Sequence, residues 1–101
     1  MEIKLWKTGN IGIFVYDAFN EDFLKELMRR IDSELHQIKR VPKHLYHYKR
    51  EDNFFVFTTH SIHRDLYYNL MRIIDDLILD FNIQMTRNET IESKVFNCHW
   101  K

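Results

Sequence analysis

Histidines are the side chains of this sequence best suited to acid–base chemistry near neutral pH. Two of them, His44 and His47, lie in a polar and aromatic run that spans residues 44–50. A histidine can serve as a general base when an acid and a phosphate-binding group converge on it. The run therefore allows a metal-independent ribonuclease that uses His44 or His47. The alternative is an exposed hairpin with aromatic pairs between its strands.

Metal and thiol chemistry have less support. His60 and His63 are three residues apart and Asp65 follows them, but His60 is expected to precede the next helix and a third ligand is not evident. Cys98 is the only cysteine, so no disulfide can form within the chain, and we expect a buried and unreactive thiol. The sequence therefore predicts neither a metal site nor a cofactor.

Aromatic residues recur on two expected strands, in the segments 13–16 and 53–57, about forty residues apart. Together with the basic Arg50, these segments resemble the two strand motifs of RNA-recognition motifs, whose aromatic side chains stack on bases. The resemblance implies an open sheet face that binds RNA or another single-stranded nucleic acid. The two glycines of the longer family motif are absent, and a core role for the aromatic residues is the alternative. The contacts implied are Tyr46, Tyr48, Arg50, Phe55 and Phe57.

An expected helix over residues 62–81 carries more apolar surface than packing against one sheet requires. Tyr68 and Leu79 lie outside its main apolar stripe. Exposed patches of this kind commonly mark protein interfaces, where tyrosine and methionine are frequent anchors. The alternative is a thick core with scattered apolar residues at the surface. The residues predicted for this interface are Tyr67, Tyr68, Met71 and Leu79.

Length and composition predict one domain over residues 1–101. Hydrophobic residues make up 45% of the chain, enough for a packed core. Fifteen basic residues balance 15 acidic residues, whereas non-specific nucleic-acid binders usually show a basic excess. Charged residues interrupt the longest apolar stretch, residues 70–81, so it cannot span a membrane, which requires about 20 apolar residues. With a lone cysteine and no apolar signal run, a cytoplasmic protein is expected.

The first half of the chain predicts a hairpin followed by a helix. Residues 3–7 alternate between apolar and polar side chains, as in a half-buried strand, and Gly9-Asn10 suits a tight turn. Residues 11–16 are apolar on both faces, which is typical of a central strand. Asn20 is a good N-cap, and apolar residues every three or four positions continue the helix towards Pro42.

The second half predicts another hairpin, a second helix and a final strand pair. Residues 45–50 and 54–59 flank a turn at 51–53, and Ser61 is a candidate N-cap for the helix over 62–81. A short strand over 82–87, a turn at Asn88-Glu89 and a last strand over 94–100 complete the order.

These elements predict an α+β fold in the ferredoxin-like βαββαβ order with an extra N-terminal strand. Two helices would cover one face of an antiparallel sheet and leave the other face open. Because such folds host many functions, the leading hypothesis rests on the surplus aromatic surface and on the lack of a catalytic motif. It is a small non-enzymatic protein-binding module of the inhibitor, adaptor or immunity type, with a protein partner or a second copy. The residue usage suggests an AT-rich genome, and a phage or mobile-element inhibitor is one case.

Overall fold

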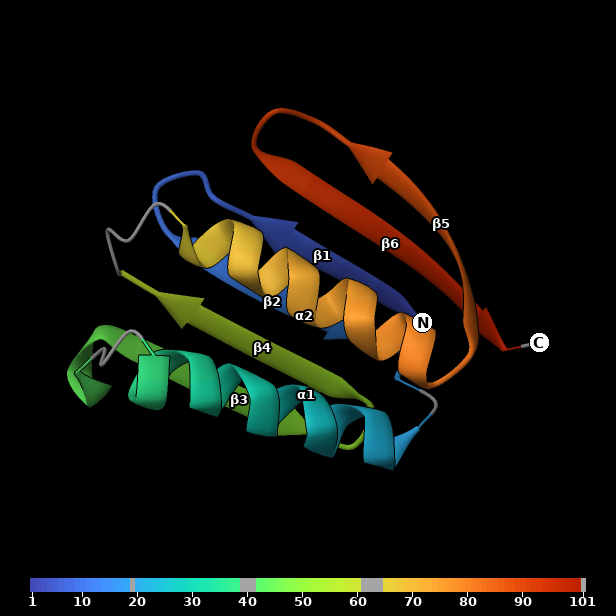
Figure 1. Cartoon of the computed structure of the whole chain (residues 1–101), viewed down its shortest axis with the longest axis horizontal. Helices are drawn as coiled ribbons and strands as arrows, with labels where there is room; N and C mark the ends of the chain where they lie inside the picture. Colours follow the sequence, from blue (N-terminus) through green and yellow to red (C-terminus); the bar gives the residue numbers. More distant parts are fainter. Residues whose placement is uncertain (19, 39–41, 61–64, 101) are drawn as a thin grey trace.

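A sheet with helices on one side forms the body of the molecule. The computed structural model describes residues 1–18, 20–38, 42–60 and 65–100, which form six strands and two α-helices (Figure 1). The strands are β1 (Glu2–Trp6), β2 (Ile11–Tyr16), β3 (Tyr46–Glu51), β4 (Phe54–Thr59), β5 (Ile83–Glu89) and β6 (Ser93–Trp100). The helices are α1 (Glu21–Ser33) and α2 (Leu66–Asp80), with a π-helical turn η1 (Glu34–Ile38) and a 3₁₀ turn η2 (Lys43–Leu45) between α1 and β3.

The described strands form one antiparallel sheet in the order β3-β4-β2-β1-β6-β5. This confirms the predicted α+β class and the interior position of β2. The strand order is not clearly ferredoxin-like, because β1 lies between β2 and β6 and pairs with both. A turn at Gly9, whose φ is 75°, folds β1 back onto β2. The extra N-terminal strand therefore sits inside the sheet and separates the C-terminal hairpin from β2.

Alternate residues of each strand point to opposite faces of the sheet, and both helices lie on the same face (Figure 1). From β2, Ile13 and Val15 are fully buried on the helical side, whereas Phe14 and Tyr16 point away from it. Burial of apolar surface makes the layer between sheet and helices the main source of stability. Other members of this core are Ile3, Leu5, Phe55, Phe57, Phe96, Phe23, Leu24, Leu27, Ile31, Leu66, Leu70, Ile74 and Leu77.

Helix α1 begins at the N-cap that the sequence predicts. The backbone N–H groups of Asp22 and Phe23 donate to Asn20 Oδ1 at 2.8 and 3.2 Å, so two of the unpaired donors of the first turn are satisfied. After Ser33 the helix widens into η1, where the buried Glu34 accepts a 2.7 Å hydrogen bond from Asn69 Nδ2 of α2. The predicted extension of this helix towards Pro42 reaches residues 39–41, which lie outside the described residues.

Helix α2 extends from Leu66 to Asp80. The predicted N-cap Ser61 and the predicted first turn at Ile62 lie outside the described residues. Neither described helix combines the length and apolar character that crossing a membrane would require. After the helix, Asn82 adopts a positive φ of 55°, which asparagine tolerates better than most residues, and the chain reverses into β5.

The C-terminal hairpin is longer than the sequence predicts. The turn expected at Asn88-Glu89 is wrong, because β5 continues to Glu89 and pairs there with Lys94 of β6. Thr90 Oγ1 accepts hydrogen bonds from the backbone N–H groups of Glu92 and Ser93 at 3.3 and 3.0 Å. A threonine hydroxyl can organise a turn in this way, so the reversal takes place at residues 90–92.

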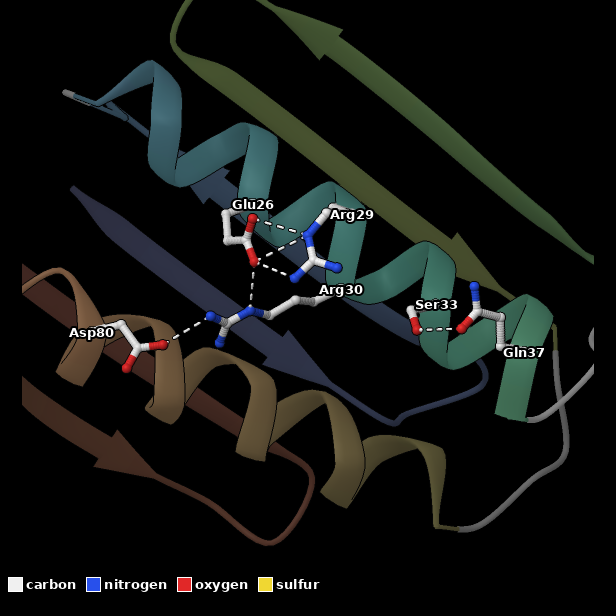
Figure 2. Close-up of polar contacts among 6 residues, drawn as sticks. All are labelled: Glu26, Arg29, Arg30, Ser33, Gln37 and Asp80. Atoms are coloured by element: carbon white, nitrogen blue, oxygen red, sulfur yellow. Dashed lines mark hydrogen bonds and ion pairs between the residues drawn. The ribbon is translucent and has the colours of Figure 1, made fainter.

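A chain of charged groups joins the two helices on their outer side (Figure 2). Arg30 donates to Glu26 Oε1 at 3.0 Å within α1 and to Asp80 Oδ2 at 2.8 Å across to α2. Arg29 also binds Glu26, and the two guanidinium groups lower the pKa of Glu26 to about 2. The same view shows Ser33 donating to Gln37 at 3.2 Å where α1 passes into η1. Of these contacts, the Arg30–Asp80 pair links the two helices above the sheet.

Candidate functional site

The aromatic residues proposed to bind nucleic acid lie on the wrong face of the sheet for that role. Phe55 and Phe57 are fully buried and Tyr46 is 8% exposed. In β4, Phe55 and Phe57 alternate with Phe54 and Val56, and the helices cover the side to which Phe55 and Phe57 point. The expectation that they face solvent is therefore wrong, because the alternation in β3 and β4 has the opposite sense to the one predicted.

The tyrosines of β3 instead connect the sheet edge to the end of α1. The Tyr46 hydroxyl lies 2.6 Å from His36 Nε2, and the Tyr48 hydroxyl donates to Asp32. Burial and, second to it, Asp32 raise the pKa of both tyrosines above its usual value. Both hydroxyls therefore stay protonated near neutral pH and cannot act as bases there. Arg50, the basic residue of the same predicted set, binds Glu21 at the start of α1.

The histidines proposed for a nuclease are not brought together by shared hydrogen bonds. His44 is exposed in η2, whereas His47 is exposed on β3 and points away from the helices. Neither histidine side chain makes a hydrogen bond or ion pair to another described residue. Among the described residues there is also no group of three or more histidine, cysteine or acidic side chains that could hold a metal ion. Cys98 is buried, and burial raises its pKa to about 11, so little thiolate forms near neutral pH.

The outer side of α2 contains only part of the predicted protein interface. Tyr68 and Leu79 are 51% and 78% exposed, and Met71 is partly buried. Tyr67 is 2% exposed, so its assignment to an exposed patch is wrong. Its ring packs beneath Lys7, whose Nζ lies 4.9 Å from the ring centre.

Charged residues break the continuity of that patch. The exposed Arg72 and Asp76 lie along the helix between Tyr68 and Leu79. Lys7 also binds Tyr68, with Nζ 3.3 Å from the hydroxyl. The outer side of α2 therefore presents separate apolar side chains rather than one apolar surface.

The face of the sheet that points away from the helices, hereafter the uncovered face, has a more continuous arrangement. It carries four aromatic side chains, hereafter the aromatic patch, on the interior strands β1, β2 and β4. Three of them are partly buried and Tyr16 is 52% exposed. Aromatic residues are typical of the centre of protein interfaces. The aromatic patch consists of Trp6, Phe14, Tyr16 and Phe54.

Trp6 packs closely against the neighbouring strand β2. It pairs with Gly12 of β2, and a Cβ atom added to Gly12 would lie 2.1 Å from Trp6 Cζ2. The indole therefore occupies the space that only a glycine leaves open. Trp6 Nε1 donates a 2.9 Å hydrogen bond to Asn10 Oδ1 in the turn between β1 and β2. The ring is fixed before any partner arrives, which reduces the entropy lost on binding.

Phe14 lies at the centre of the aromatic patch. Its ring meets Phe54 edge to face with 4.9 Å between ring centres, and it lies nearly parallel to Tyr16 at 6.2 Å. A hollow of about 600 Å³ adjoins it, lined by strand residues and by both nearby turns. Its lining residues are Glu2, Lys4, Trp6, Thr8, Phe14, Thr90, Glu92 and Ser93.

Exposed charges of both signs flank the aromatic patch. Lys4 and Glu2 lie on β1 at one side, and Lys49 and Glu51 lie on β3 at the other. Two lysines thus lie beside two glutamates, and the exposed His47 completes the β3 row. Phosphate binding favours an excess of basic side chains, whereas protein interfaces keep charges away from an apolar centre. The uncovered face fits the second description.

Sequence reasoning identified the segment 13–16 but missed Trp6 and Phe54 as surface residues. Gly12 was the available signal, because a glycine inside a strand often marks the close approach of another group. Its partner in the hairpin is Trp6. Comparison with protein-family models gave no match, and searches of curated proteins and of solved structures found no significant match either.

Proposed function

We propose that the chain is a non-enzymatic binding module whose uncovered face binds a protein. The observation that carries the proposal is the aromatic patch on the interior strands, flanked by charges of both signs. A module of this kind would act by occupying a surface of its partner, as inhibitors, adaptors and immunity proteins do. Within this proposal, the likeness to a ferredoxin-like fold is limited to the unit β2-α1-β3-β4, in which β4 pairs with both β2 and β3.

Apolar rings that stay in contact with water carry a free-energy cost that a partner could remove. Phe14, Phe54 and Trp6 are only partly buried, although each is large enough to contribute strongly when fully buried. A partner that covered them would gain the apolar burial that the fold itself leaves unused. The ring of Trp6 is already fixed by Asn10 and Gly12, so ordering it costs little on association.

Binding of single-stranded nucleic acid is the second candidate, and one observation favours it. Phe14 and Tyr16 belong to the segment that resembles the first strand motif of RNA-recognition motifs, and both lie on the uncovered face. Bases could stack on these rings. The described charged residues around the same rings show no basic excess, which favours a protein over a phosphate backbone.

Site-specific photo-cross-linking separates these outcomes. A benzophenone amino acid would replace Tyr16 on the uncovered face or, as a matched control, Tyr68 on α2. The two tyrosines are 52% and 51% exposed, so differences in yield report the surface rather than accessibility. We expect protein adducts from position 16, few from position 68, and loss of the former in a Phe14→Glu variant. Adducts only from position 68 would contradict the proposal, and RNA adducts from position 16 would replace it with the second candidate.

A further inference from the structure

We infer that the protein that binds the uncovered face is a second copy of this chain. The two copies would be related by a twofold axis that lies in the plane of the sheet and runs perpendicular to the strands. The inference rests on the proposed function, since it names the partner of the same surface. Three features of the uncovered face support it, namely the order of its charges, its size and the hollow beside Phe14.

The strand register places side chains of the uncovered face in two adjacent rows. One row crosses four neighbouring strands with a lysine at each end. The other row lies two residues further along each strand and has a glutamate at each end. The lysine row is Lys49, Val56, Phe14 and Lys4, and the glutamate row is Glu51, Phe54, Tyr16 and Glu2.

A twofold axis between these rows makes the face complementary to itself. Rotation about that axis turns the copy over, keeps each strand above its equivalent, and exchanges the two rows. Glu2 of one copy then faces Lys4 of the other, and Tyr16 faces the other copy's Phe14. The same operation sets Glu51 against Lys49 on β3. An isologous interface requires this reciprocity, in which each contact occurs twice.

Other twofold arrangements of the same face lose this match. An axis parallel to the strands would bring the glutamate row against the glutamate row and the lysine row against the lysine row. Like charges directly opposed across an interface are strongly unfavourable. The order of charges therefore selects one orientation, and this selection is what makes the inference testable.

The size of the face is sufficient for such an interface. The molecule measures 37 × 28 × 21 Å along its principal axes. Figure 1 looks down the shortest axis onto the helices, with the sheet spread behind them across the two longer axes. A standard stable interface buries about 800 Å² on each partner, less than the area that these two dimensions enclose.

The hollow beside Phe14 fits the same arrangement. Glu2 and Glu92 contribute two carboxylates to its lining, against the single ammonium group of Lys4. In the twofold arrangement the other copy's Lys4 faces Glu2, so its flexible side chain would enter the hollow from the opposite copy. The hollow would then hold a charge pair at the flank of the aromatic centre.

The test is a charge-exchange experiment on the full chain, followed by sedimentation velocity and native mass spectrometry. The first variant is Lys4→Glu, the second is Glu2→Lys, and both positions are exposed. A concentration series up to about 1 mM covers weak association. We expect a dimer of the unchanged chain and at least about 100-fold weaker self-association of each variant, because both symmetric contacts become repulsive. An equimolar mixture of the two variants should form a heterodimer, since every opposed pair regains opposite charge.

A mismatched mixture provides the control. Lys49→Glu and Lys4→Glu change the net charge of the chain equally, but Lys49 is expected to face Glu51 rather than Glu2. A mixture of Lys49→Glu with Glu2→Lys should therefore stay dissociated, although its net charges equal those of the matched mixture. Circular dichroism and urea unfolding of each variant check that the fold is retained.

Each result decides the inference. Rescue by the matched mixture alone supports it. A chain that stays monomeric throughout the series overturns it, and so does equal association of the matched and mismatched mixtures or undisturbed self-association of the single variants. If cross-links from position 16 then identify a different protein, the proposed function stands without the second copy. If position 16 gives no protein adduct, the proposed function fails as well.

Discussion

The same strands form both faces of the sheet, but the helices cover only one of them. In β2, Ile13 and Val15 are fully buried beneath the helices, while Phe14 and Tyr16 between and beside them stay in contact with solvent. Both pairs are apolar, so hydrophobicity alone does not separate core from surface here. What separates them is the cover supplied by α1 and α2. The apolar side chains that neither helix covers are therefore the ones on which a partner could pack.

The covered face has little tolerance for change, whereas the uncovered face keeps its apolar area available. The rings of Phe55 and Phe57 fit a closed layer between sheet and helices. Within the aromatic patch, Phe14 contacts Tyr16 and Phe54 and Trp6 packs against Gly12, but each ring retains a solvent-facing side. Substitutions on the first face should therefore act on folding, and substitutions on the second face mainly on association.

The largest expected effect comes from Phe57→Ala on the covered face. Phe57 is fully buried, and removing such a ring leaves a cavity that costs about 3–5 kcal/mol. The matched change on the uncovered face is Phe14→Ala, with an expected loss of about 1 kcal/mol because that ring is only partly buried. Urea unfolding of dilute protein measures both values. Equal losses would remove the distinction between the two faces.

The next effect is expected from Gly12→Ala, which tests whether Trp6 is held against the sheet. The new methyl group would lie 2.1 Å from the indole, so the ring must move, at a cost of about 1–3 kcal/mol for overpacking. In a Trp6→Ala background the same change should be neutral or stabilising, since alanine is favoured over glycine within a strand by about 0.5–1 kcal/mol. Urea unfolding of the four chains gives the coupling energy. An equal cost in both backgrounds would show that the contact with Trp6 is not responsible.

A smaller effect is expected from the helical cover itself. Asn20→Ala removes the acceptor for the N–H groups of Asp22 and Phe23, with an expected loss of about 1 kcal/mol in the free energy of unfolding. Asn20→Ser should keep most of the stability because serine is also a good N-cap. Thermal and urea unfolding would show whether the two variants differ. If they lose the same amount, the capping bond is not the cause.

The smallest effect concerns the pH dependence of the bridge between the helices. The pKa of Glu26 is lowered to about 2 in the folded chain from an ordinary value of 4.5. A group with a depressed pKa contributes stability that is present above its unfolded value and is lost as pH falls through its folded value. The difference in stability between the unchanged chain and Glu26→Gln should therefore stay constant above pH 4.5 and shrink towards pH 2. Urea midpoints across that range measure it, and added salt should reduce the difference because the carboxylate is only partly buried. A pH-independent difference would show that the charge of Glu26 plays no part.

Local signals in the sequence predicted those features of the fold that depend on neighbouring residues. The N-cap at Asn20 and the interior position of β2 follow from residue types within a few positions. The end of β5 was missed because the hydroxyl of Thr90 organises the turn, whereas the sequence pattern predicted a turn at Asn88-Glu89. The place of β1 in the sheet depends on long-range pairing with β6, for example between Glu2 and Asn97. Alternation within one segment does not encode such a pairing.

The candidate site was predicted less well than the fold, for a definite physical reason. Alternation divides Phe54, Phe55, Val56 and Phe57 into two sets but does not say which set the helices cover, because both sets are apolar. The predicted set, with Phe55 and Phe57, proved to be the covered one. Gly12 opposite Trp6 was the only local mark of the other face, and it becomes informative once the hairpin register is known.

The most direct test of the account is a dilution series followed by ¹H–¹⁵N NMR of the unchanged chain. If the uncovered face is the site of self-association, the amide shifts that change with concentration should cluster at Lys4, Phe14, Lys49 and Val56 and leave α1 and α2 unchanged. Changes centred on Leu79 of α2, or shifts that do not depend on concentration, would contradict it.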